Sequence, residues 1–220
     1  MKLSEIFNHL TYGELSQLSL GGAVNGEIPE AKYLALISSI NLGLTALHTR
    51  FYLKEGQLKF IVSGEGATYD LERDDILKIE QVFTEEGHEL GVNDYTDPYT
   101  CLTPTLRSLT IPEVMVTKGP DLPEELITDV LRVVYRANHP PIPYDLDPSL
   151  YEVALPYSHL QALLYFVASR HHNPIGMINE FHSGNSWAAK YEMECTRLEL
   201  KNIQIDQGQS SARLLKGGWV

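Results

Sequence analysis

Residues 156–203 constrain the fold of this chain more than any other stretch, because they predict two amphipathic helices separated by a polar break. In the first helix, Leu160, Leu163, Leu164 and Val167 follow the i, i+3, i+4, i+7 spacing of a face that packs on a core. Ser158 and Gln161 have the spacing of a capping box at its start. The second helix repeats the apolar spacing. Its four apolar positions are Ala188, Tyr191, Cys195 and Leu198.

A third helix is predicted over residues 29–50, where an apolar stripe has heptad-like spacing. Its stripe consists of Tyr33, Leu36, Ile37, Ile40, Leu44 and Leu47. Leu34 and Leu42 lie off this stripe, so they are either ordinary surface leucines or part of a subunit contact.

The segment between these helices has short β-branched and aromatic runs separated by turns, which is typical of strands. Strands are predicted at 75–83, 108–116, 128–136 and 151–155, and a hairpin at 51–62. We therefore predict an α+β fold, a bundle of three main amphipathic helices with a β-rich insertion and an extended C-terminal arm. The predicted boundaries are 1–50 plus 156–205 for the bundle, 51–155 for the insertion and 206–220 for the arm.

The arm is polar but carries apolar and basic side chains that a featureless tail would lack. Short apolar anchors in an extended segment commonly bind a partner. The candidate partner-binding residues are Arg213, Leu214, Leu215, Lys216, Trp219 and Val220. The alternative is that this tail packs back on its own domain.

Composition and motifs exclude several function classes. A net charge of −12 over 220 residues argues against a general nucleic-acid binder, because such proteins cluster Lys and Arg against phosphates. No apolar run approaches the ~18 residues of a membrane span. The first 20 residues contain Glu5 and Glu14 and no apolar run, so no signal peptide is expected. Cys101 and Cys195 are expected to be free thiols.

We expect no enzyme activity, no metal and no cofactor. The chain has no G-x-S-x-G or Walker-type motif. The set His171, His172, His182 and Cys195 lacks the tight pairs that zinc sites use. The four glutamates 80, 85, 86 and 89 flank turns and are expected to be surface charge. A small cytosolic α+β enzyme remains an alternative, with His182, Tyr191 and Glu194 as its first candidates.

Residues 30–62 and 126–203 resemble the head-to-tail adaptors, or connectors, of tailed bacteriophages. The segments that carry this resemblance are LISSINLGLTALHTRFYLKEGQL, LRVVYRANHPPI, LPYSHLQALLYFVASRHHNPIG and FHSGNSWAAKYEMECTRLELKNI. Residues 63–125 match only in general character.

The resemblance implies a virion structural protein of the neck, assembled in the host cytoplasm. It implies a homo-oligomeric ring, a dodecamer, beneath the portal protein and above a downstream tail or nozzle protein. Genomic DNA would pass through the ring without specific binding, and the arm residues would contact the portal. Another tail component, a tail-completion or baseplate protein, is the nearest alternative.

Overall fold

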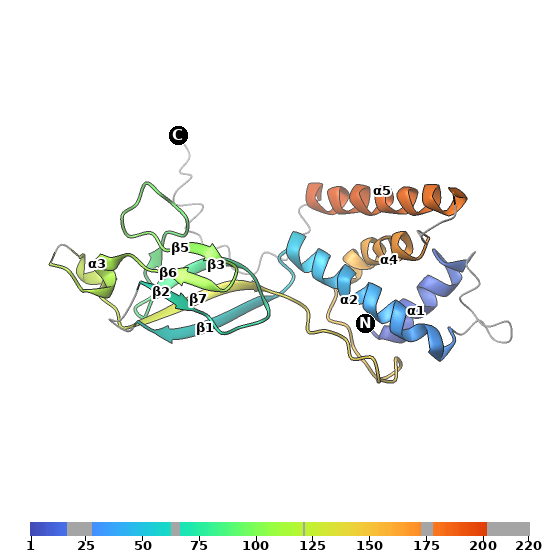
Figure 1. Cartoon of the computed structure of the whole chain (residues 1–220), viewed down its shortest axis with the longest axis horizontal. Coiled ribbons are helices and arrows are strands. Elements are labelled where there is room, and N and C mark those ends of the chain that lie inside the picture. The colour runs from blue at the N-terminus through green and yellow to red at the C-terminus, as the bar shows by residue number, and fades with distance from the viewer. Residues whose placement is uncertain (17–27, 63–66, 121, 173–177, 202–220) are drawn as a thin grey trace. The chain divides into compact units, whose positions relative to one another are not determined.

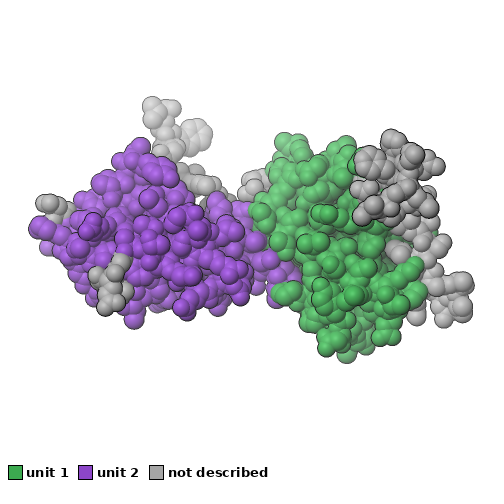
Figure 2. Space-filling view, viewed as in Figure 1, with its two compact units in different colours: residues 1–53, 141–220 green, residues 54–140 purple. Residues whose placement is uncertain are grey.

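A computed structural model describes residues 1–16, 28–62, 67–120, 122–172 and 178–201, with the backbone alone for 178–184. The chain divides into two compact units (Figure 2). The helical unit comprises residues 1–53 and 141–220, and the strand unit comprises residues 54–140. Each unit has its own hydrophobic core. No helix in the described ranges is long and apolar enough to cross a membrane.

The helical unit is organised around α4 (Figure 1). Its elements are α1 (Leu3–Tyr12), the 3-10 turn η2 (Glu30–Lys32), α2 (Tyr33–Arg50), α4 (Tyr157–His171) and α5 (Ile178–Leu200). Helix α4 packs against α1, α2 and α5, whereas the backbones of α2 and α5 make little contact with each other. The predicted apolar face of α4 is confirmed as buried, since all four of its residues belong to the core.

Gly43 sets how closely α2 approaches α4. A Cβ at this position would lie 2.7 Å from Leu163 Cδ1 and 2.9 Å from Phe166 Cδ1. A larger residue would force the side chains of Leu163 and Phe166 to shift, so glycine allows the two helices to meet at this distance without repacking.

Helix α1 and the segment before α4 complete the same unit. The N–H of Leu3 donates to the carbonyl of Tyr151 at 3.0 Å, and the N–H of Val153 donates to the carbonyl of Met1 at 2.8 Å. Residues 141–155 therefore belong with the helices, whereas the sequence analysis assigned them to the β-rich segment.

The strand unit contains two antiparallel sheets. Its elements are β1 (Glu55–Ile61), β2 (Thr68–Asp70), β3 (Ile76–Thr84), β4 (Glu89–Leu90), β5 (Leu102–Thr105), β6 (Ser108–Thr110), α3 (Glu113–Val116), η3 (Glu124–Leu126) and β7 (Val130–Ala137). The strand orders are β1-β7-β3-β4 and β2-β6-β5. The predicted strands at 75–83 and 128–136 are confirmed as β3 and β7. The predicted 51–62 hairpin is wrong, because 55–61 form the single strand β1, which pairs with β7.

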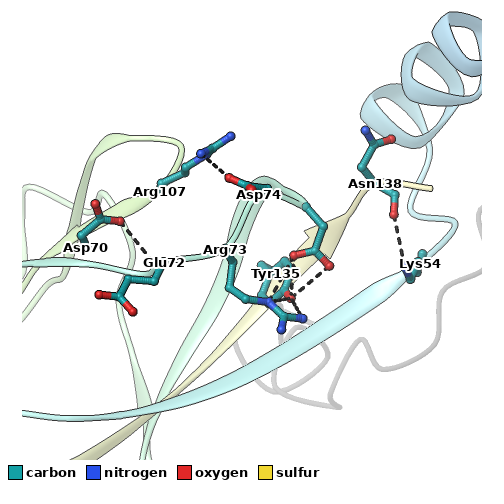
Figure 3. Close-up of polar contacts among 9 residues, drawn as sticks. Lys54, Asp70, Glu72, Arg73, Asp74, Arg107, Tyr135 and Asn138 are labelled. Atoms are coloured by element: carbon teal, nitrogen blue, oxygen red, sulfur yellow. Dashed lines mark hydrogen bonds and ion pairs between the residues drawn. The ribbon is translucent and has the colours of Figure 1, made fainter. Parts of the chain in front are cut away.

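Tyr135 anchors one end of the four-stranded sheet (Figure 3). Its fully buried ring lies over Gly56 of the neighbouring strand. Arg73 Nη2 donates to the Tyr135 hydroxyl at 3.0 Å, and this hydroxyl donates to Asp75 at 3.2 Å. Burial raises the pKa of Tyr135, so the hydroxyl keeps its proton and serves as both donor and acceptor.

The predicted bundle of three main helices is wrong, although an α+β class is compatible with the structure. The two sheets bury a hydrophobic core of their own, so they form a unit in their own right and not an insertion attached to a helical bundle. In the helical unit, α1 contributes Leu3, Ile6, Phe7 and Leu10 to the core, and α2 and α5 do not pack along each other. Apolar spacing identifies a buried face but does not say which element covers it.

Candidate interaction surface

The candidate residues of the C-terminal arm, Arg213, Leu214, Leu215, Lys216, Trp219 and Val220, lie outside the described residues. The two leucines that the sequence analysis singled out on the third predicted helix are described, and both are exposed. Leu34 is 62% and Leu42 is 54% solvent-accessible. The candidate site that can be built from described residues is therefore a surface of the helical unit.

We define the α2 stripe as Leu34, Ser38, Leu42, Thr45 and Thr49, which follow one another on the outer face of α2. The sequence has no Asp, Glu, Lys or Arg between Lys32 and Arg50, and His48 is buried. The hydroxyl of Thr49 donates to the carbonyl of Thr45 at 2.8 Å, which turns a polar group toward its own helix. This face is thus less polar than its residue names suggest.

A second stripe with the same character lies on α5. We define the α5 stripe as Ala189, Met193, Thr196 and Leu200. Met193 is 72% and Leu200 is 84% solvent-accessible. The hydroxyl of Thr196 again donates to its own helix, to the carbonyl of Glu192 at 2.9 Å.

Arg50 ties the end of α2 to α5. Its Nη1 lies 2.6 Å from Glu192 Oε2, and its Nε lies 2.7 Å from Glu199 Oε1. The hydrogen bond from Arg50 lowers the pKa of Glu199, and the same bond raises the pKa of Arg50. Glu192 and Glu199 flank the α5 stripe, so this pairing turns their charges toward α2 and leaves the stripe itself uncharged.

The described residues among those considered for an enzyme, Tyr191, Glu194 and Cys195, do not form a reactive cluster with one another. The Glu194 carboxylate pairs with Arg197, whose Nε lies 2.7 Å from Oε2. Burial raises the pKa of Tyr191 and that of the Cys195 thiol, which disfavours their nucleophilic anions. The side chain of His182 lies outside the described residues.

The strand unit also lacks a reactive cluster in its described part. Burial raises the pKa of the Cys101 thiol to about 12. Glu80 pairs with Lys78 and Arg136, while Glu85 and Glu86 are exposed at a turn. A hollow of about 300 Å³ lies beside Lys78, Thr103 and Leu106, but it brings no set of catalytic groups together. Among the described side chains, no group of three or more His, Cys, Asp or Glu residues is placed so that it could hold a metal ion.

Comparison with known proteins adds no assignment: no protein-family model matches the chain, and no curated protein matches it. The surface therefore has to be interpreted from its own chemistry. The sequence analysis found Leu34 and Leu42 but missed Met193 and Leu200. The same helical spacing, applied to the outer face of the last predicted helix, would have found them.

Proposed function

We propose that this protein is a head-to-tail adaptor of a tailed bacteriophage, a virion structural protein that forms a ring beneath the portal. The resemblance of residues 30–62 and 126–203 to such adaptors supports this proposal. The two uncharged stripes of the helical unit support it independently, because they give each copy exposed apolar side chains on two helices that neighbouring copies could cover.

The observation that carries the proposal is the α2 stripe. A helix on the surface of a soluble monomer normally carries charged residues on the side opposite the core. Helix α2 instead presents Leu34 and Leu42 on a face without charge over 17 positions, from Tyr33 to Thr49. Exposing these apolar side chains to water costs free energy. Contact with another chain would remove them from water and so remove that cost.

Two stripes on different helices favour a head-to-tail arrangement. If the α2 stripe of one copy covers the α5 stripe of the next, every copy uses both surfaces, and a rotation between copies that divides a full turn evenly closes the contacts into a ring. The net charge of −12 suits a channel through which DNA passes, because carboxylates repel phosphates. In this proposal the partners are the portal, a downstream tail protein and copies of this chain, and the place of action is the virion neck.

The test mixes the purified chain with the portal protein of the same phage and images the mixture by negative-stain electron microscopy. The proposal expects a ring on the portal. Leu34→Glu and Leu42→Glu should each abolish the ring, because a charge would be buried in an apolar contact. Leu150→Glu is the control, since Leu150 is an exposed leucine of the same unit, 80% solvent-accessible, that lies on neither stripe.

Two results would contradict the adaptor function. One is a chain that stays unassembled when mixed with portal. The other is a chain that ignores portal but assembles with a distal tail protein, which would favour the tail-completion or baseplate alternative. Equal ring formation by the stripe variants and the control would refute the role of α2 alone.

A further inference from the structure

The outer face of the four-stranded sheet, formed by β1, β7 and β3, carries two neighbouring cations (Figure 1). Lys59 of β1 lies directly opposite Arg132 of β7, and Arg132 lies opposite Phe83 of β3. Directly opposite residues of an antiparallel pair share one face of the sheet. Leu58 and Phe60 pack against the core of the strand unit, so the three residues point away from it. We call Lys59, Arg132 and Phe83 the cationic face.

The two cations of this face oppose each other without compensation. Like charges directly opposite each other across a sheet are destabilising. On the same side of the sheet, Arg136 is compensated, because its Nη2 lies 2.7 Å from Glu80 Oε1. Within the described ranges no carboxylate forms an ion pair with Lys59 or Arg132, and the Arg132 guanidinium lies 4.7 Å from the centre of the Phe83 ring. A partner with negative charge would therefore relieve the repulsion.

The same unit carries a loop with complementary chemistry. We define the Tyr95 loop as residues 91–101, which connect β4 to β5. Its tip presents the Tyr95 side chain, which is 84% solvent-accessible. The loop contains two carboxylates, and the sequence has no Lys or Arg between Lys78 and Arg107. The loop thus offers an aromatic ring and negative charge together.

Hydrogen bonds hold this loop in a defined shape. Asn93 Oδ1 accepts from the N–H of Thr103 at 3.0 Å, and Asn93 Nδ2 donates to the Thr103 hydroxyl at 2.7 Å. Asp97 Oδ1 accepts from the N–H of Tyr99 at 2.9 Å. Because the loop is already ordered, presenting Tyr95 to a partner costs little conformational entropy. Tyrosine is also one of the residues that most often dominate a protein–protein contact.

We propose that the Tyr95 loop of one copy docks on the cationic face of a second copy of this chain. The ring of Tyr95 packs against the Arg132 guanidinium and the Phe83 ring, both of which favour an aromatic neighbour. The carboxylate of Asp97 supplies the negative charge that Lys59 and Arg132 lack. Nucleic acid would bring negative charge as well, but the net charge of −12 opposes its approach.

The contact joins two different surfaces, so it is heterologous and can continue from copy to copy. It does not rest on the adaptor function, because it is measured on the chain alone, without portal. The parent chain carries Leu42→Glu, so that the α2 stripe does not contribute. Sedimentation velocity up to about 1 mM, the range of weak association, should show oligomers that grow with concentration and shrink with added salt.

Two variants of the parent chain disable one surface each. Tyr95→Ala removes the anchor of the loop and keeps the face, whereas Arg132→Glu reverses a charge of the face and keeps the loop. Each variant alone should associate at least roughly tenfold more weakly than the parent. An equimolar mixture should form a 1:1 dimer, since the intact loop of one variant fits the intact face of the other. Growth should stop there, because the remaining loop and face are both disabled.

Three controls separate docking from folding and from net charge. Arg132→Glu places a carboxylate opposite Lys59 of its own chain, so its thermal melt should not fall. Asp97→Asn removes a charge but keeps an oxygen that accepts from Tyr99, so it should weaken association without changing the melt. Lys118→Glu changes the net charge as much as Arg132→Glu at an exposed residue outside both surfaces, and should associate like the parent.

Several results would overturn the proposal. One is a parent chain that is monomeric throughout the concentration series, and another is a variant mixture that stays monomeric or grows beyond the dimer. Equal weakening by Lys118→Glu and Arg132→Glu would show that net charge alone controls association. If the monomeric parent bound a fluorescein-labelled oligo-dT strand and Arg132→Glu lost that binding, the face would belong to nucleic acid instead.

Discussion

Gly56→Ala tests whether the contact between β1 and the Tyr135 ring limits the stability of the strand unit. An added Cβ would lie 2.3 Å from Tyr135 Cζ and 2.5 Å from Cε2. Ordinary contacts between carbon atoms are about 3.5–4.0 Å long, so the ring would have to move by more than ~1 Å. The ring is fully buried, and its hydroxyl is held between Arg73 and Asp75.

Three contributions set the size of the effect. Overpacking a core typically costs about 1–3 kcal/mol. Displacing the Tyr135 hydroxyl also weakens its hydrogen bonds to Arg73 and Asp75, which adds a smaller cost because Arg73 is half-exposed. Replacing glycine by alanine in a strand returns about 0.5–1 kcal/mol. The free energy of unfolding of the strand unit should therefore fall by about 1–3 kcal/mol.

Urea unfolding provides the measurement, because its two signals separate the units. Far-ultraviolet circular dichroism follows both units, whereas Trp187 packs against the core of the helical unit and, in a Trp219→Phe background, is the chain's one remaining tryptophan. Tryptophan fluorescence should keep the wild-type midpoint. In a Tyr135→Leu background, which removes the ring, Gly56→Ala should cost less than about 1 kcal/mol. An equal cost in both backgrounds would show that the ring is not the obstacle.

Three further predictions follow from the helical unit and the arm. Leu164→Asp should unfold the helical unit, since an unpaired carboxylate in a packed core costs several kcal/mol; an unchanged thermal melt would place Leu164 outside the core. Deleting residues 207–220 should abolish binding to portal while leaving the melt unchanged, and retained binding would refute the arm's role. Burial lowers the pKa of His159, so the unfolded state binds the proton first, and stability should fall as pH drops below about 6.5. His159→Leu should flatten this dependence in urea titrations at about pH 7 and pH 5.

The helices were the most predictable part of the fold, because the face that meets the core repeats along each helix. Leu163, Leu164 and Val167 are buried as their spacing predicts. The spacing did not show which element packs against each apolar face. Helix α1 is not among the three main helices that the sequence predicts, yet Leu3 and Ile6 are fully buried. Its place depends on hydrogen bonds to residues about 150 positions away in the sequence, which local periodicity does not reveal.

Local signals were misleading where long-range contacts compete with them. The predicted capping box of Ser158 and Gln161 does not form, because α4 begins at Tyr157 and Ser158 lies inside the helix; Gln161 instead donates to Glu14 at 2.7 Å. Helix α4 begins after Pro156 without a side-chain cap. Likewise, Lys54 to Gln57 resembled a turn, but pairing with β7 extends this stretch into β1. On the candidate surface, spacing located Leu34 and Leu42, whereas the Arg50 bridge to α5 required the folded arrangement.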